Sequence, residues 1–323
     1  MMSFIRGAAL AALAVLCVLP ARAEDVVRLG NLRFAHYGAV SYMKEIAPKY
    51  GIRIEERVFA KGLDIQPAII AGEIDLGASA LEAAIAGRAG GAPIVAVAGF
   101  ARGGARIVAR PDLQIGSVAA LKGHTVGVTR GGPQELLLLA ELRQHGLSWS
   151  DKPGKDVRLV YMVYPDLNQA LAAKNLDAIS QSEPYASQLL NKGLATEVIR
   201  PYDTPMGEPV RALVMAEKFY REKPDLARRT MLAFVEATSA FIADPALAES
   251  YVRTQMFKGQ ISADDFRDAM NNAAYTYDLS VAQVEAVTRT MQETGVGRMA
   301  KPPAAAEWVR LDLLENAKAE LKK

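Results

Sequence analysis

The chain has 323 residues, half of them apolar, and its 38 basic and 36 acidic side chains leave a net charge of +2. This balance, without a polybasic run, argues against nucleic acid and anionic membranes as partners. Only one cysteine, Cys17, and three widely spaced histidines (His36, His124 and His145) are present. The sequence therefore predicts no disulfide, no metal site and no cofactor.

The first 23 residues have the layout of a secretory signal peptide. Arg6 precedes an apolar run at residues 8–19, and Ala21-Arg22-Ala23 closes it with an Ala-x-Ala pattern. The run is too short for a membrane span, which needs roughly 20 apolar residues. We expect cleavage after Ala23 and a periplasmic mature protein whose charges balance, because two arginines leave with the signal. The alternative is a buried N-terminal helix.

Strand and helix patterns alternate through the first half of the mature chain, which predicts a mostly parallel sheet in an α/β fold. The length favours two domains. Strands are expected at residues 26–32, 52–59, 74–78 and 93–100, and again near 125–128. Helices are expected at residues 39–50, 64–73, 79–90 and 133–146. Ser79 and Glu82 have the spacing of a capping box for the third of these helices.

An internal repeat links two parts of the chain. Residues 68–75 correspond to residues 170–177 at a constant offset of 102, and the repeat includes Asp75 and Asp177. Each copy has a helix, a tight turn, a short strand and a corner that opens another helix. The repeat predicts two lobes of similar build, although chance similarity between two Ala- and Leu-rich units would also produce it.

Beyond residue 216 the chain is expected to be helical to its end. Ser280 and Gln283 have a second capping-box spacing, ahead of a helix pattern, and residues 263–275 and 304–323 also have helix patterns. The chain is expected to cross between the lobes at residues 109–112 and again near residues 209–213.

Ligands bind outside the carboxyl ends of strands in open parallel sheets. The loops there are residues 33–40, 77–81, 100–104, 129–134 and 181–185. Several lead into helices, whose free N-terminal amides suit anions. Arg102 and Arg130 could pair with a carboxylate, sulfonate or phosphate, or could lie in solvent. Glu183 could accept hydrogen bonds, bind a ligand amine or simply end its loop.

Catalytic motifs are absent from the sequence. It has no Gly-x-Ser-x-Gly elbow, no Walker-type phosphate loop and no His-Glu-x-x-His. With no cysteine beyond the signal and scattered histidines, the sequence predicts no catalytic residue.

Four stretches resemble the ABC transporter substrate-binding proteins of the nitrate, sulfonate, taurine and pyrimidine-precursor group. They are IIAGEIDLGASALEAAIAG, SVAALKGHTVGVTRGG, LNQALAAKNLDAISQSEPYAS and KFYREKPDLARRTMLAFVEATSAFIADP. The resemblance covers nearly all of the mature chain. One departure is that members acting as enzymes of thiamine-precursor synthesis carry a cysteine-rich motif, which this chain lacks.

The resemblance implies a type II periplasmic-binding-protein fold with two hinge crossings. Lobe 1 would comprise residues 24–110 and 212–323, and lobe 2 residues 111–211. Ligand contacts would come from loops facing the cleft between the lobes. By position these are Phe34, His36, Tyr37, Ser79, Ala80, Arg102, Arg130, Gly131, Gly132, Ser182 and Glu183.

The function implied is a monomeric solute receptor of an ABC importer, which delivers a small organic anion to a permease and its ATPase in the inner membrane. A sulfonate or an aromatic carboxylate is favoured. Nitrate or a thiamine pyrimidine precursor is an alternative ligand. An enzyme on this fold, such as a lyase or synthase, and a sensor that binds a membrane protein are alternative functions.

Overall fold

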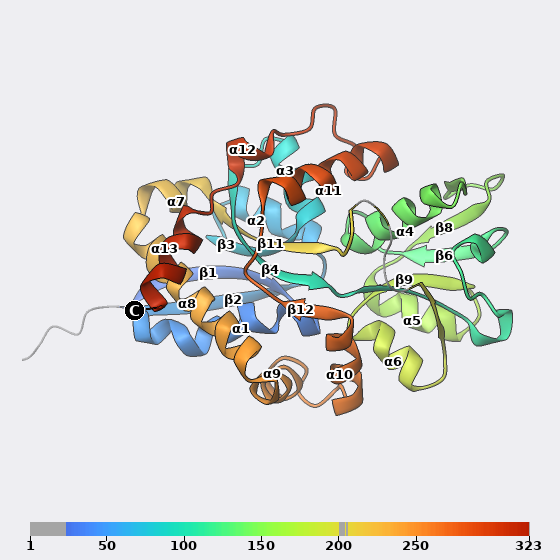
Figure 1. The fold of residues 1–323 in the computed structure, drawn as a ribbon, viewed down its shortest axis with the longest axis horizontal. Coiled ribbons are helices and arrows are strands. Elements are labelled where there is room, and N and C mark those ends of the chain that lie inside the picture. The colour runs from blue at the N-terminus through green and yellow to red at the C-terminus, as the bar shows by residue number, and fades with distance from the viewer. Residues whose placement is uncertain (1–23, 200–203, 205, 323) are drawn as a thin grey trace, which may run out of the picture.

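The computed structural model describes residues 24–199, 204 and 206–322. The expected signal peptide and its cleavage site lie outside the described residues. Two six-stranded sheets lie side by side, each with helices on its faces (Figure 1). The expected two-lobed α/β architecture is confirmed. We call each sheet with its covering helices a lobe.

The first sheet has the strand order β12-β4-β11-β3-β1-β2. β1, β2 and β3 are parallel, and β11 runs antiparallel between β3 and β4. The strands are β1 Asp25–Leu32, β2 Ile52–Phe59, β3 Leu76–Ala80, β4 Ile94–Gly103, β11 Val210–Ala216 and β12 Ala273–Tyr275.

The second sheet has the strand order β10-β5-β9-β6-β8-β7. Its strands are β5 Ala105–Ala109, β6 Thr125–Val128, β7 Trp149–Ser150, β8 Val157–Tyr161, β9 Ala178–Ser182 and β10 Thr196–Ile199. Its helices are α4 Pro133–Gln144, α5 Tyr164–Ala172 and α6 Tyr185–Asn191.

The internal repeat corresponds to equivalent positions in the two sheets. The order β11-β3-β1-β2 matches β5-β9-β6-β8, with the same parallel and antiparallel neighbours. The repeated aspartates make the same kind of hydrogen bond in each lobe. Asp75 accepts the backbone N–H of Arg28 at 3.0 Å, and Asp177 accepts that of Thr125 at 2.9 Å, so each carboxylate binds the neighbouring strand.

Helices cover the first sheet and make up most of the C-terminal part. They are α1 Gly38–Ile46, α2 Ile65–Ile70, α3 Leu81–Ala89, α7 Glu217–Glu222, α8 Pro224–Ala243, α9 Pro245–Tyr251, α10 Ala263–Asn271, α11 Val281–Thr294, α12 Ala305–Trp308 and α13 Asp312–Leu321, with a 3-10 turn, η1, at Ala35–Tyr37. The helical prediction is wrong at β12, which pairs with the edge of β4. It is also wrong where Val309 breaks the last helix by bridging to Ala96.

α8 is the central helix of the C-terminal segment. Its side chains Met231, Phe234 and Phe241 are buried, and it packs against α1 and α13. Within the described ranges, no single helix is long and apolar enough to cross a membrane. α8 and the segment Pro245–Met256 meet the requirements of length and composition only as a pair, which is bent by 109°.

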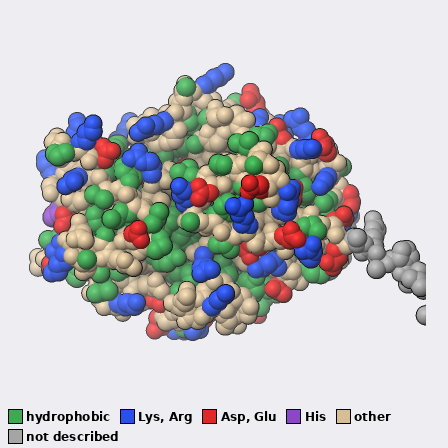
Figure 2. Space-filling model, turned by 180° about the vertical axis from the view of Figure 1, so that it is seen from behind, with side chains coloured by type: hydrophobic (Ala, Val, Ile, Leu, Met, Phe, Trp, Pro, Cys, Tyr) green, Lys and Arg blue, Asp and Glu red, His purple; other side chains and the backbone are tan. Residues whose placement is uncertain are grey.

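The face of the molecule seen in Figure 2 carries basic and acidic side chains intermixed, with hydrophobic side chains between them. No broad area of one sign covers this face, in keeping with the near-neutral composition.

The chain crosses from the first sheet to the second at Gly103 and Gly104, which have φ angles of +70° and +73°. The expected crossing at residues 109–112 is wrong, because residues 105–109 form β5 and pair with β9 in the second sheet. The return to the first sheet begins β11 at Val210, inside the expected range of residues 209–213.

One of the two predicted capping boxes forms. The Ser280 hydroxyl accepts the Gln283 N–H, and the Gln283 side chain accepts the Ser280 N–H. The Ser79–Glu82 box is wrong, because β3 continues to Ala80 in register with β11 and α3 begins only at Leu81. The Ser79 hydroxyl accepts from Gln66 and donates to the Ala80 carbonyl instead.

We expect Gly104→Ala to lower the free energy of unfolding by about 2 kcal/mol or more. Alanine at a left-handed φ is strained by about 1–2 kcal/mol, and a Cβ at this position would lie 2.5 Å from the His36 ring. Gly72→Ala is the matched control, because Gly72 has a φ of +70° and no neighbour within 4 Å. Urea denaturation measures the free energy of unfolding of both variants. An equal decrease for Gly104→Ala and Gly72→Ala would contradict the proposed contact with His36.

Candidate functional site

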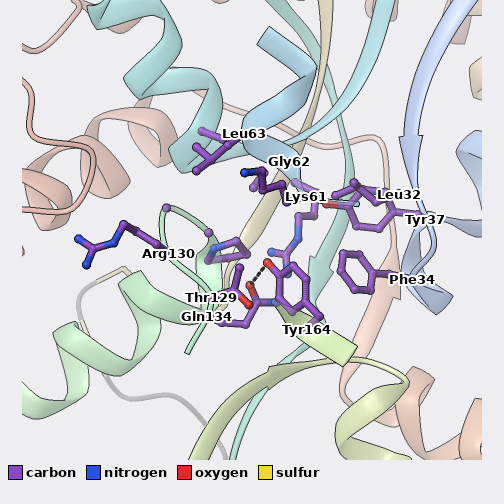
Figure 3. Close-up of a pocket in the computed structure, with 16 residues that line it drawn as sticks. Leu32, Phe34, Tyr37, Lys61, Gly62, Leu63, Thr129, Arg130, Gln134 and Tyr164 are labelled. Atoms are coloured by element: carbon purple, nitrogen blue, oxygen red, sulfur yellow. Dashed lines mark hydrogen bonds between the residues drawn. The ribbon is translucent and has the colours of Figure 1, made fainter. Parts of the chain in front are cut away.

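A narrow cavity lies between the lobes, where the carboxyl ends of β1, β3 and β6 meet (Figure 3). The cavity has a volume of about 350 Å³, which includes space open to solvent, and it is too narrow to leave room for more than a water-sized molecule. Its lining residues are Leu32, Phe34, Tyr37, Lys61, Gly62, Leu63, Ala80, Ala83, Thr129, Arg130, Gly131, Gly132, Pro133, Gln134, Tyr164 and Arg211.

The lobes touch across this cavity. The ring of Phe34, from the first lobe, meets that of Tyr164 edge-on, with 5.0 Å between ring centroids. Leu63 packs so closely on Gly131 that a Cβ there would lie 2.9 Å from its methyl carbon. A ligand larger than water can therefore enter only when the lobes move apart, as in hinge closure.

Arg211 is the buried cation of the cavity wall. Its side chain is 1% exposed, and neither terminal guanidinium nitrogen has a hydrogen-bond partner among the described residues. β11 holds it in register with Ala80 on β3 and with Ala101 on β4. A buried charge is normally paired, because removing it from water costs several kcal/mol. The arrangement suits an anion.

The ionisable groups around Arg211 are buried as well. Burial raises the pKa of Tyr37 to about 12, against the charge of Arg211. Burial, reinforced by the same charge, lowers the pKa of His36 well below its ordinary value, so this ring stays neutral. Burial raises the pKa of Glu82 to about 7, and the charge of Arg211 opposes that rise. Both carboxylate oxygens of Glu82 lack a hydrogen-bond partner among the described residues.

Aromatic rings form the apolar wall. Phe34 contacts Tyr37 edge-on, with 5.4 Å between ring centroids, in addition to its contact with Tyr164. The Tyr164 hydroxyl donates to the Gln134 side-chain oxygen at 3.0 Å (Figure 3). The cavity therefore offers flat apolar surface on one side and a bare cation on another.

The glycine loop of the second lobe comes from the start of α4. Pro133 occupies the first turn of the helix, as its sequence position predicts. The Gly131 N–H is already taken, because it donates to the Glu135 carboxylate at 2.5 Å. Arg130 lines the cavity, but its guanidinium group points away from the other labelled side chains (Figure 3) and lies 3.6 Å from the centre of the Tyr161 ring.

Residues 26–254, well over half of the chain, match the NMT1-like family. The chain belongs to the NMT1-like family. A putative ABC transporter periplasmic binding protein of Brachyspira hyodysenteriae is 25% identical over 69% of this chain and 67% of its own length. A putative aliphatic sulfonates-binding protein of Escherichia coli is 33% identical over 42% of this chain and 41% of its own length.

Solved structures share the fold of this NMT1-like chain. The alkanesulfonate-binding protein of Xanthomonas axonopodis pv. citri, bound to MOPS, superimposes with a TM-score of 0.73 at 19% identity. The match covers 88% of this chain and 98% of that chain. The periplasmic-binding-protein fold is therefore confirmed.

The structure brings six of the sequence-predicted site residues to the cavity. They are Phe34, Tyr37, Ala80, Arg130, Gly131 and Gly132. Five others do not line it, namely His36, Ser79, Arg102, Ser182 and Glu183. Arg102 is partly exposed and lies 3.9 Å from Asp278. Ser182 is buried in β9 and donates to the Gly104 carbonyl at the crossing between the lobes.

Glu183 belongs to a buried cluster near that crossing. Its carboxylate lies 3.0 Å from the Arg106 guanidinium and accepts hydrogen bonds from Ser187 and Asn272. Arg106 also binds Asp268 on α10 at 2.9 Å. Of the three roles considered for Glu183, the contacts of this NMT1-like protein favour acceptance of hydrogen bonds.

Sequence reasoning missed Arg211, Lys61, Leu63 and Tyr164, among others. Arg211 carried a signal, because it is the single charge in the apolar strand VRALVMA. A lone charge in a buried strand is expected to be paired or functional. Tyr164 carried none that distinguishes it from a core tyrosine.

We expect Glu183→Gln to lower the free energy of unfolding by about 3 kcal/mol, because it removes the fully buried counter-ion of a buried arginine. Asp112→Asn, which removes one partner of an exposed ion pair with Arg110, should change it by less than about 1 kcal/mol. Chemical denaturation of both variants measures this. Equal effects would mean that the Glu183 cluster contributes no more than a surface ion pair.

Proposed function

We propose that this NMT1-like chain is an extracytoplasmic solute-binding receptor of an ABC importer and that it binds a small organic anion between its lobes. The observation that carries this proposal is the buried guanidinium group of Arg211 in the wall of the interlobe cavity, with no partner for its terminal nitrogens among the described residues. The names of the relatives, as ABC periplasmic and sulfonate-binding proteins, support the importer part.

The cavity favours a particular class of anion. Arg211 offers two free nitrogens on one planar group, which match a carboxylate or sulfonate in a bidentate fashion. The rings of Phe34, Tyr37 and Tyr164 suit an apolar or aromatic body beside it. A sulfonate or an aromatic carboxylate is therefore favoured. Nitrate would leave the aromatic wall uncovered, and an uncharged pyrimidine precursor would leave the guanidinium group unpaired.

The proposal also includes the location of the protein and its partners in the membrane. The expected signal peptide would export the protein to the periplasm, where the closed form would present the anion to a permease and its ATPase. We propose a monomer, since one chain supplies every wall of the cavity. The alternative, an enzyme on this fold, predicts that a bound anion is converted, which product analysis by chromatography would detect.

Thermal unfolding of residues 24–323 against a panel of anions tests the proposal. The panel contains sulfonates, aromatic carboxylates, nitrate, thiamine precursors and amino acids. A ligand at about 100 times its dissociation constant adds about 2.7 kcal/mol to the free energy of unfolding, so the midpoint rises. We expect sulfonates or aromatic carboxylates to raise it most. A panel in which no anion raises the midpoint would contradict anion binding.

We expect Arg211→Gln to weaken binding of the best anion by about 1.5–3 kcal/mol, the range for a hydrogen bond to a charged group. At about pH 5, where Glu82 is protonated, the free variant should unfold at a higher temperature, because it no longer buries an unpaired charge. Arg130→Ala is the matched control, since it removes one positive charge from the same cavity rim. Isothermal titration calorimetry measures both variants. A large loss for Arg130→Ala with none for Arg211→Gln would assign the anion to Arg130.

A further inference from the structure

Two buried residues of opposite charge, Glu82 and Arg211, act on each other electrostatically without forming an ion pair. Glu82 is 1% exposed, on the first turn of α3, and Arg211 is 1% exposed, on β11. β11 pairs Arg211 with Ala80, two residues before Glu82. No ion pair within 4.0 Å joins the two groups, and neither the carboxylate oxygens nor the terminal guanidinium nitrogens have hydrogen-bond partners among the described residues.

An anion at Arg211 would change the balance for Glu82. In the free protein, the positive charge of Arg211 favours the ionised carboxylate. A bound anion cancels that charge and adds a negative one within the same buried region, where fields are weakly screened. Ionised Glu82 and bound anion then repel each other, and a proton on Glu82 removes the repulsion.

The neighbouring groups do not take this proton. The elements around the site contribute Tyr37 and His36 from η1, Tyr164 from α5, and Glu135 from α4, whose buried carboxylate already accepts the Gly131 N–H. Burial raises the pKa of both tyrosines, so their hydroxyls are neutral near neutral pH and have no site to protonate. Burial is the larger cause that lowers the pKa of His36, and it persists when a bound anion cancels the charge of Arg211. Among the described residues, the charge that acts on the carboxyl of Glu82 is that of Arg211.

We propose that anion binding at Arg211 is coupled to uptake of one proton by Glu82, which makes Glu82 the residue that sets the pH dependence of affinity. The inference rests on the proposed function, because it requires an anion at Arg211. The step is a simple protonation: one proton from solvent is added to one carboxylate oxygen as the anion enters. Affinity should therefore rise as pH falls.

The first arm of the test needs no ligand. Unfolded Glu82 has an ordinary pKa, whereas the pKa of folded Glu82 is raised to about 7. Stability is therefore lost as pH rises from the unfolded pKa to the folded one. Glu82→Gln should match the wild-type melting temperature at about pH 5 and exceed it at about pH 8. In the Arg211→Gln background, the rise in melting temperature caused by Glu82→Gln should continue to increase at higher pH, because the pKa of Glu82 is then no longer lowered by Arg211. A gain that is the same at every pH, or unaffected by Arg211→Gln, overturns the coupling.

The second arm measures the coupling directly. Isothermal titration calorimetry with benzenesulfonate and with benzoate, at about pH 6, 7 and 8 and in buffers of different ionisation enthalpy, reports both affinity and proton uptake. Both anions stay ionised over this range. We expect wild-type affinity to fall by up to about tenfold per pH unit as pH rises, the limit for one proton. Proton uptake should accompany binding, and Glu82→Gln should show neither effect.

The outcomes separate the two claims. Binding with pH-independent affinity and no proton uptake overturns the role of Glu82 and leaves the proposed function standing. No binding of either anion, together with no response to the wider panel, overturns the proposed function and the coupling with it. Glu82→Asp should keep the pH dependence, which a purely structural role for Glu82 would not predict.

Discussion

A buried guanidinium group without a partner is the constraint on which the rest of the binding site depends. Burying a charge costs several kcal/mol when nothing compensates it, and among the described residues the terminal nitrogens of Arg211 have no hydrogen-bond partner of good geometry. A chain under selection for stability alone would have little reason to keep this arrangement in the middle of an apolar strand. An unpaired Arg211 is expected if its partner is the ligand. Ligand binding would then offset the free-energy cost of burying the guanidinium charge, and this would strengthen the affinity.

The fold places Arg211 between the lobes, where a ligand bound to it can also contact the second lobe once the lobes close. β11 is the strand that returns from the second lobe, and it is inserted between β3 and β4 of the first sheet. Its first residues lie at the crossing, so Arg211 faces both lobes. The opposite wall, with Tyr164 and the glycine loop of α4, belongs to the second lobe. A ligand between them would contact both lobes only in the closed form, and this difference in contacts is what shifts a hinge equilibrium.

The fold could be predicted from the sequence much further than the site. The repeated aspartates and the constant offset of 102 predicted that β3 and β9 are equivalent strands, because such a repeat depends only on spacing along the chain. Ser79 and Glu82 misled the prediction, because pairing with β11, a long-range contact, keeps Ser79 in the strand and leaves Glu82 buried without the cap. Arg211 was missed for a similar reason: the apolar strand around it signals a buried charge, but its lack of a partner shows only when the sheets are assembled. Three of the five loops named from strand ends, residues 33–40, 77–81 and 129–134, line the cavity, since parallel-sheet topology fixes where they meet.

The most direct test of the account is a crystal structure of residues 24–323 with the anion that stabilises the protein most. The account predicts that the acidic group of the anion lies within about 3.2 Å of the Arg211 guanidinium nitrogens, as in an ordinary hydrogen bond, with its apolar part against the rings of Phe34 and Tyr164. An anion bound elsewhere, with the terminal nitrogens of Arg211 still unpartnered, would contradict it.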